Sequence, residues 1–389
     1  MDSSPVLYST VPQRTRRTRF VCISDTHNCT VKLPKGDVLI HCGDLTNQGS
    51  FGELQKQVTW LESAADFECK LVIAGNHDLT LDTDFFEQYG NYFHNNTPQS
   101  PVDCQNLLTQ SKSLTYLQHS SHTIKLTAPS GPRTTFNVFG SPYIPSCGKW
   151  AFQYSRSDPG AAEKIWRDIP LNTDILVTHG PARTHRDESR HRGALGCESL
   201  RQAMWRVRPR LALCGHVHEA RGVERIRWDL SNKFVRYKEL ASDYQWDDPG
   251  VGNKKNCLVD LTAKGGMPLD NDGSMVSPPP PSSPLSPLPT SRPPLHMTEG
   301  SAVKDTIRMG DSMETVLEGA SPGIGTRGLS GNPASARGDR AALAGRLGRK
   351  ETCVVNCAIQ ASSYPHLGPR RLHKPIVIDV DLPLWEDNS

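Results

Sequence analysis

Short apolar runs alternate with amphipathic stretches along most of the chain. Six apolar runs predict buried strands: 20–24, 37–42, 70–75, 136–140, 174–178 and 211–214. The stretches between them have helical spacing or a composition that favours helices: 51–65, 84–89, 161–168 and 198–206. Because predicted strands and helices alternate, the pattern indicates an α/β sandwich with mixed or parallel sheets.

The pattern changes after about residue 263. Residues 277–295 read SPPPPSSPLSPLPTSRPPL, and this much proline excludes a helix or a central strand. Few large apolar residues follow until about residue 350, and then CVVNCAI and PIVIDVDLP restore strand-like patterning. We therefore expect four parts, namely a flexible basic N-terminus (1–18), a folded domain (19–262), a disordered Pro/Ser/Gly-rich insertion (263–350) and C-terminal strands that complete the domain (351–389).

Composition narrows the class of protein. The formal net charge of +3 and the pI of about 8.3 are too mild to predict a nucleic-acid partner. The eleven cysteines form no CxxC pair and no apolar leader precedes them, so reduced thiols are expected. No apolar window has the length of a membrane span. These features predict a soluble, cytoplasmic protein that binds neither membrane nor nucleic acid.

Polar side chains follow five of the predicted strands. The fragments are Asp25-Thr26-His27, Asp44, Asn76-His77-Asp78, His179 and His216-Val217-His218. Each fragment alone is explained as a helix cap, a turn or a structural histidine. Together they fall where open α/β sheets bind ligands, outside the carboxyl ends of strands. Two aspartates, one asparagine and four histidines, with no thiolate, suit two divalent metals rather than a structural zinc site.

The fragments DxH, GD, GNHD, THGP and GHVH, in this order between residues 20 and 218, resemble the calcineurin-like metallophosphoesterase superfamily. A narrower resemblance, to the metallophosphoesterase-domain-containing (MPPED) family, rests on VCISDTHN, VIAGNHDLT, FGSPYIPSCGKWAF, VRPRLALCGHVHEARG and ASSYPHLGPRRLHKPIVIDVDLP. The resemblance implies a four-layer sandwich of two packed mixed β-sheets flanked by helices. Some animal members of that family carry glycine in place of the first histidine of the last fragment, whereas this chain keeps His216. The proline-rich insertion departs from the compact family pattern.

The resemblance also implies a role for each polar residue. Asp25, His27 and His218 would hold the first of two divalent metal ions (manganese, iron or zinc). Asn76, His179 and His216 would hold the second, and Asp44 would bridge the two. A water shared by the metals would be the nucleophile. His77 would donate a proton or a hydrogen bond to the leaving group, and Asp78 would orient the His77 imidazole and raise its pKa.

Several functions stay open at this point. The resemblance implies hydrolysis of phosphodiesters, with cyclic nucleotides as the leading substrate class. A phosphomonoesterase, including a protein phosphatase, is the alternative chemistry because the metal residues are shared across the superfamily. A non-catalytic protein that binds a proline-motif-binding partner through the insertion is an alternative of another class. A nuclease would need a more basic surface.

Two other features have both a functional and a purely structural interpretation. Trp150 and Phe152 either stack on a base or fill the core, and the core is favoured. A basic segment follows His179, and it either grips an anionic substrate or is a solvated loop. Its members are Arg183, His185, Arg186, Arg190, His191 and Arg192.

Overall fold

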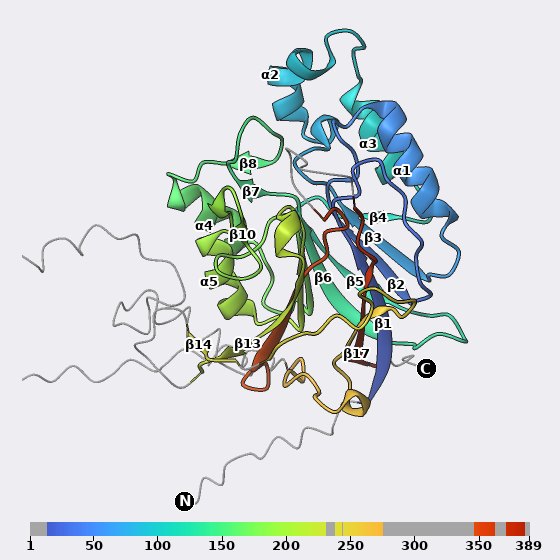
Figure 1. The fold of residues 1–389 in the computed structure, drawn as a ribbon, viewed down its shortest axis with the longest axis vertical. Helices are drawn as coiled ribbons and strands as arrows, with labels where there is room; N and C mark the ends of the chain where they lie inside the picture. Colours follow the sequence, from blue (N-terminus) through green and yellow to red (C-terminus); the bar gives the residue numbers. More distant parts are fainter. Residues whose placement is uncertain (1–13, 231–237, 243, 275–345, 362–370, 386–389) are drawn as a thin grey trace, which may run out of the picture.

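The structure is a computed structural model that describes residues 14–230, 238–242, 244–274, 346–361 and 371–385. The proline-rich stretch lies outside the described residues, and so does the predicted binding of a partner to it. Two main sheets form the centre of the described fold (Figure 1). The six-stranded sheet has the order β15-β17-β1-β2-β3-β4 and the seven-stranded sheet the order β14-β13-β16-β12-β9-β6-β5.

The bounds of the strands are as follows. The six-stranded sheet contains β1 (Thr15–Ile23), β2 (Val38–Cys42), β3 (Cys69–Ile73), β4 (Thr115–Tyr116), β15 (Cys257–Asp260) and β17 (Ile376–Pro383). The seven-stranded sheet contains β5 (Ser120–Lys125), β6 (Thr135–Ser141), β9 (Ile175–Thr178), β12 (Leu211–Cys214), β13 (Gly222–Trp228), β14 (Glu239–Leu240) and β16 (Glu351–Asn356). Two short pairs join β7 (Ile144–Pro145) to β8 (Gln153–Tyr154), and β10 (Glu188–Ser189) to β11 (Gly193–Ala194).

Helices cover the outer face of each sheet (Figure 1). Next to the six-stranded sheet lie α1 (Phe51–Ser63), α2 (Thr83–His94) and α3 (Pro101–Thr109). Next to the seven-stranded sheet lie α4 (Pro159–Arg167) and α5 (Glu198–Val207). Single 3₁₀ turns occur at Leu79–Leu81, His218–Ala220 and Ala263–Gly265. None of the helices in the described part of the chain is long and apolar enough to span a membrane.

Alternation along the strands builds three apolar layers. In β1, Phe20 and Cys22 face the space between the sheets, whereas Val21 and Ile23 pack under α1 and α3. In β9, Ile175 and Val177 face the same inner space, and Leu176 packs against α4 and α5. Because successive strand residues point to opposite faces, a continuous apolar run is buried on both sides. The predicted four-layer sandwich is confirmed.

The last described segments complete both sheets. β16 lies between β12, which it meets in parallel, and β13, which it meets antiparallel. β17 pairs antiparallel with β1 and parallel with β15. Both strands are therefore interior strands rather than additions at an edge.

The folded part reaches beyond the expected boundaries. β1 begins at Thr15, inside the N-terminus expected to be flexible, because β17 provides a pairing partner as far as Thr15 and Arg19 forms two hydrogen bonds of 2.7 Å with Asp379. Both ends of the expected insertion, 263–274 and 346–350, also pack on the fold. Asn271 pairs with Arg349, and Arg349 is 1% exposed and donates to Asp174.

Candidate metal centre

The carboxyl ends of five strands meet at one edge of the sandwich. β1, β2 and β3 are parallel neighbours in one sheet, and β9 and β12 are parallel neighbours in the other. The sheets touch at this edge, where Ser24 forms an isolated bridge with Ala358. The residues that follow these strands include all seven metal ligands predicted from the sequence: Asp25, His27, Asp44, Asn76, His179, His216 and His218.

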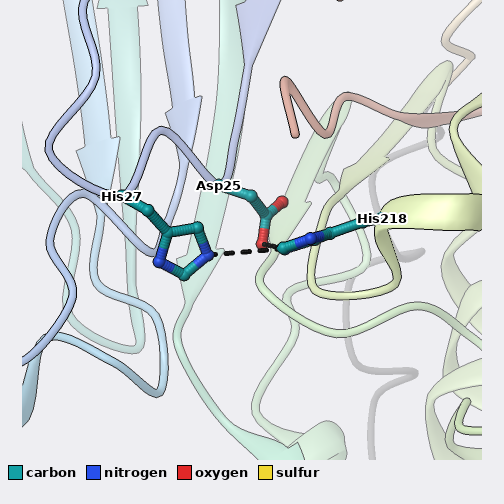
Figure 2. Close-up of side chains that lie close together, drawn as sticks. All are labelled: Asp25, His27 and His218. Carbon is teal, nitrogen blue, oxygen red and sulfur yellow. Dashed lines mark hydrogen bonds and ion pairs between the residues drawn. The ribbon is translucent and has the colours of Figure 1, made fainter. Parts of the chain in front are cut away.

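Asp25, His27 and His218 form the first group of candidate ligands. One ligand atom from each lies within 4.8 Å of the others. His218 Nε2 is 3.3 Å from Asp25 Oδ1 and 3.4 Å from His27 Nε2. In Figure 2 the carboxylate and the two imidazoles point toward one another, although His218 comes from the opposite sheet.

The second group is centred on His179. Ligand atoms of Asp44, His179 and His216 also lie within 4.8 Å of one another. His179 Nε2 is 3.0 Å from Asn76 Oδ1 and 3.3 Å from Asp44 Oδ1. The rings of His179 and His216 meet edge to face, with their centroids 5.1 Å apart.

Asp44 lies between the two groups. Its Oδ2 is 3.6 Å from His27 Nε2, and its Oδ1 is 3.3 Å from His179 Nε2. Each oxygen of one buried carboxylate therefore faces a different group. This is the arrangement that a bridging ligand between two cations requires.

Two glycines allow the sheets to approach this closely. A Cβ on Gly215 would lie 2.0 Å from Ser24 Oγ and 2.3 Å from Asp25 Oδ2. A Cβ on Gly75 would lie 2.2 Å from Asp44 N and 2.8 Å from His179 Cε1. The backbone beyond Gly215 then reaches Asp25, and His216 N donates to the Asp25 carboxylate at 3.0 Å.

The charges of most of the ligands suit cations, and His179 is the exception. Burial lowers the pKa of His179, but the charge and hydrogen bond of Asp44 outweigh it and raise that pKa to about 9, so this imidazole must lose a proton to bind a metal. Burial raises the pKa of the Asp25 carboxyl, but the hydrogen bond and charge of His218 outweigh it and lower that pKa to about 2. Burial also opposes ionisation of Asp44, and His179 and His77 nevertheless hold its pKa well below the usual range. Burial lowers the pKa of His27 to about 4 and that of His216 to about 3. Ionised carboxylates and neutral imidazoles are the forms that bind metals.

Backbone carbonyls orient two of the imidazoles. His27 Nδ1 is 3.1 Å from Thr46 O, and His179 Nδ1 is 2.9 Å from Cys42 O. A carbonyl only accepts hydrogen bonds, so each Nδ1 carries the proton and each Nε2 is left as the ligand atom. Oxygen and imidazole nitrogen donors without thiolate fit hard or borderline divalent cations such as manganese, iron or zinc. The residues present therefore fit two such ions.

Asp78 has a different position from the one expected. Its carboxylate is 0% exposed and accepts hydrogen bonds from Gly75 N at 2.8 Å, Leu45 N at 3.2 Å, Thr46 N at 2.9 Å and Thr46 Oγ1 at 2.7 Å. The expectation that Asp78 orients the His77 imidazole is wrong, because these donors turn its side chain inward. Asp78 instead ties the loop after β2 to the loop after β3.

The His77 imidazole has partners that the sequence analysis did not find. Its Nδ1 is 2.9 Å from Asn47 O, and its ring centroid is 3.9 Å from that of Trp150. A backbone carbonyl leaves no signal in a sequence, whereas an aromatic residue in GKWAF is a weak signal. Phe152 is 2% exposed and belongs to the core, as expected, and Trp150 is half-buried at the site.

Several side chains of the basic segment after His179 form hydrogen bonds with other parts of the protein. His185 Nδ1 is 2.6 Å from Glu224 Oε1, and Arg183 Nη1 donates to Ala194 O at 3.0 Å. Arg192 is connected to a candidate ligand through Cys147, because its Nη1 is 3.6 Å from Cys147 Sγ, which is 3.8 Å from His216 Nε2. Arg183 and His185 therefore stabilise a loop, and whether Arg192 contacts an anionic substrate stays a hypothesis.

Residues 18–220, which include every candidate ligand, match the family model described as calcineurin-like phosphoesterase. The chain belongs to this family. It is 38% identical over 242 residues to human "Metallophosphoesterase domain-containing protein 1", covering 60% of this chain and 70% of the human protein. The family assignment confirms both the predicted family and the predicted class, a phosphoester hydrolase.

Other relatives of this family member differ in length. Over 217 residues the chain is 43% identical to a protein of Emericella nidulans named "Probable rhamnogalacturonate lyase C", and the match covers 55% of this chain but 18% of that protein. The "UPF0046 protein K07C11.7" of Caenorhabditis elegans is 37% identical over 209 residues, which cover 53% of this chain and 65% of that protein. The chain thus spans about a fifth of the length of the Emericella nidulans protein and about two thirds of the length of the human and Caenorhabditis elegans proteins.

Two solved structures that align with the chain are distant from it in sequence. A purple acid phosphatase from yellow lupin aligns with a TM-score of 0.30 and 13% identity over 56% of this chain and 40% of that protein. TT1561 of Thermus thermophilus aligns with a TM-score of 0.35 and 10% identity, covering 55% and 84%. Neither likeness bears on the activity of the chain.

Proposed function

We propose that this family member is a metal-dependent phosphodiesterase with a dinuclear centre. The observation that carries the proposal is Asp44, whose two oxygens face two separate ligand groups at 3.6 and 3.3 Å. In this proposal Asp25, His27 and His218 hold one ion, Asn76, His179 and His216 hold the other, and Asp44 bridges them. Bound there, the ions supply charge neutralisation of the phosphate and an activated water.

The protein itself supplies acid catalysis. His77 follows the ligand Asn76, and its backbone N–H donates to Asp44 Oδ1 at 2.8 Å, which fixes the residue beside the proposed centre. Because Nδ1 donates to Asn47 O, Nε2 is the ring nitrogen left to face the departing oxygen. The imidazolium, which carries a hydrogen on both nitrogens, would deliver the Nε2 proton and become the neutral Nδ1–H form. Asp78 supports this chemistry indirectly, since it holds the loops that carry Asp44 and Asn76.

We propose cyclic nucleotides, or diesters like them, as the substrate class, and manganese, iron or zinc as the metals. The family description and the intact ligand set support a phosphoester substrate, and the family resemblance of the sequence favours diesters. We also propose a cytoplasmic location. All eleven cysteines are free thiols, which suits a reducing compartment.

The test is hydrolysis of bis-p-nitrophenyl phosphate compared with p-nitrophenyl phosphate by protein stripped of metal and resupplied with manganese. We expect metal-dependent turnover that favours the diester. Asp44→Asn should abolish turnover and weaken metal binding by more than about 100-fold, the upper end of what losing a supporting partner costs. Asp66→Asn, at an exposed aspartate, is the matched control and should behave as the wild type.

Other outcomes would overturn the proposal in distinct ways. Preference for the monoester would replace the diesterase with a phosphatase. Absence of turnover of either substrate by protein with two bound metals would contradict a catalytic role and favour an interaction protein.

A further inference from the structure

The imidazole of His77 is enclosed by three neighbours that arrive from different parts of the chain. The indole of Trp150 lies against one face, with centroids 3.9 Å apart and an interplanar angle of 32°. The ring of His27 meets it edge to face at 4.8 Å and 90°. Asn47 O accepts from Nδ1 at 2.9 Å. Within the described residues, these contacts leave Nε2 without a protein hydrogen-bond partner.

The backbone that follows Trp150 is fixed at two successive residues. Ala151 N donates to Asn76 O at 3.2 Å, and Phe152 N donates to Asp82 Oδ2 at 2.6 Å. The indole also packs on Phe93 of α2, with centroids 5.7 Å apart. The indole therefore stands on a rigid base that includes the backbone of the candidate ligand Asn76.

A hydrogen bond alone does not define the orientation of a partly exposed imidazole. Water competes for both Asn47 O and Nδ1, so the net gain from that bond is small. If the ring flips about its Cβ–Cγ bond, Nδ1 exchanges places with Cδ2 and Nε2 with Cε1, so Nε2 no longer faces the substrate. An aromatic face packed against the ring opposes such a flip, since the ring cannot rotate out of the stacked plane without colliding with the indole. The indole also shields the Nδ1–Asn47 hydrogen bond from water on one side.

We propose that Trp150 is a positioning residue for His77, holding the imidazole so that Nδ1 stays on Asn47 O and Nε2 faces the leaving oxygen. This inference rests on the proposed function, because it assigns His77 the transfer of a proton to the leaving group. Trp150 touches His77 and, through its own backbone neighbour, Asn76, and it adds no metal ligand. Trp150 therefore affects proton transfer rather than metal binding.

The kinetic test compares two diesters that differ only in the leaving phenol, methyl p-nitrophenyl phosphate and methyl phenyl phosphate. p-Nitrophenolate leaves without a proton, whereas phenolate needs one. We expect Trp150→Ala to lower kcat about tenfold for the phenyl diester and less than about threefold for the nitrophenyl diester, a part of what general acid catalysis contributes. KM and metal content should not change, because the Ala151–Asn76 bond is made by the backbone.

Three variants separate positioning from other roles. Trp150→Phe keeps an aromatic face and should restore most of the lost kcat. In a His77→Ala background, Trp150→Ala should have no further effect, since the residue it positions is gone. Trp60→Ala is the matched control, because Trp60 is also half-buried on the same core cluster but lies in α1. An equal loss with both leaving groups, or an added loss in the His77→Ala background, would overturn the proposal.

An NMR measurement tests the same inference without turnover. In the neutral ring that remains once the Nε2 proton is lost, ¹⁵N shifts of His77 should show the Nδ1–H tautomer in the wild type. They should show a mixture of tautomers in Trp150→Ala and the wild-type state again in Trp150→Phe. An unchanged tautomer in Trp150→Ala would contradict positioning. If wild-type protein with bound metal hydrolyses neither diester, the proposed function fails, and the ring signals alone decide the role of Trp150.

Discussion

Hydrogen bonds with backbone groups, more than charged neighbours, orient the side chains of individual ligands at the candidate metal centre. The carbonyls of Cys42 and Thr46 fix the imidazoles of His179 and His27, and both oxygens of Asp25 share the hydrogen bond donated by the His216 N–H. The last of these contacts depends on Gly215, since any side chain there would occupy the place of Ser24 Oγ and Asp25 Oδ2. A single methyl group can therefore disturb ligands from both sheets.

Gly215→Ala should displace Asp25 and lower the metal content of the purified protein. We expect metal affinity to fall at least about tenfold, the lower end of what losing an orienting contact costs. Equilibrium dialysis with manganese measures this. Gly52→Ala is the control, because a Cβ at that helix position meets nothing within 4 Å and alanine favours a helix. Normal metal affinity in Gly215→Ala would refute the close approach of the sheets.

Among the secondary-structure elements, the loop after β9 is joined to its surroundings by a charged cluster. His185 lies 2.6 Å from Glu224 of β13 and 3.3 Å from Glu239 of β14, and Arg201 of α5 donates to Glu239 at 2.8 and 2.6 Å. Burial lowers the pKa of His185, but the hydrogen bonds and charges of the two glutamates outweigh it and raise that pKa to about 9. The imidazolium thus holds three elements together near neutral pH.

This cluster predicts a stability that depends on pH. The pKa of His185 is higher in the folded protein than in the unfolded chain, so its contribution is complete below the unfolded value of 6.5 and is lost as pH rises through about 9. At most about 3 kcal/mol of unfolding free energy is involved. Urea denaturation from about pH 6 to about pH 9 should show a smaller loss of stability for His185→Gln than for the wild type. Identical slopes would contradict the prediction.

For the molecule as a whole, the two sheets close only when the last segments of the chain are present. β16 pairs with β12 and β13, and β17 pairs with β1 and β15, so each fills an interior position of its sheet. An interior strand satisfies hydrogen bonds on both of its edges, and its loss leaves two rows of buried backbone groups without partners. Segments more than 100 residues apart in sequence thus form one cooperative unit.

A chain that ends at residue 274 should not fold. Supplying residues 346–389 as a separate polypeptide should restore the fold, because the contacts of β16 and β17 are made by pairing and packing rather than by chain continuity. Circular dichroism and co-purification of the two pieces measure this. A folded, monomeric 1–274 fragment would contradict the interior placement of both strands.

Local patterns predicted the strands around the site well. Continuous apolar runs gave β1, β2, β3, β6, β9 and β12 to within a few residues, apart from the early start of β1 at Thr15. That extension could not be predicted, because it depends on β17 and on the Arg19–Asp379 pair, 360 residues apart in the sequence. α3 and β5 were also missed, since their apolar spacing is weak and neither was among the expected elements.

The sequence by itself determined which residues gather at the candidate site, because a polar residue directly after a buried strand must lie at that end of the sheet. Only the tertiary structure decided how those residues are oriented. Asp78 follows His77 in the chain, but hydrogen bonds from Thr46 and Gly75 turn its side chain away from the His77 ring. Trp150, which lies 73 positions after His77, packs against that ring instead. Spacing fixes where a backbone emerges from a strand, whereas the direction of a side chain depends on contacts between segments that come together only in the folded protein.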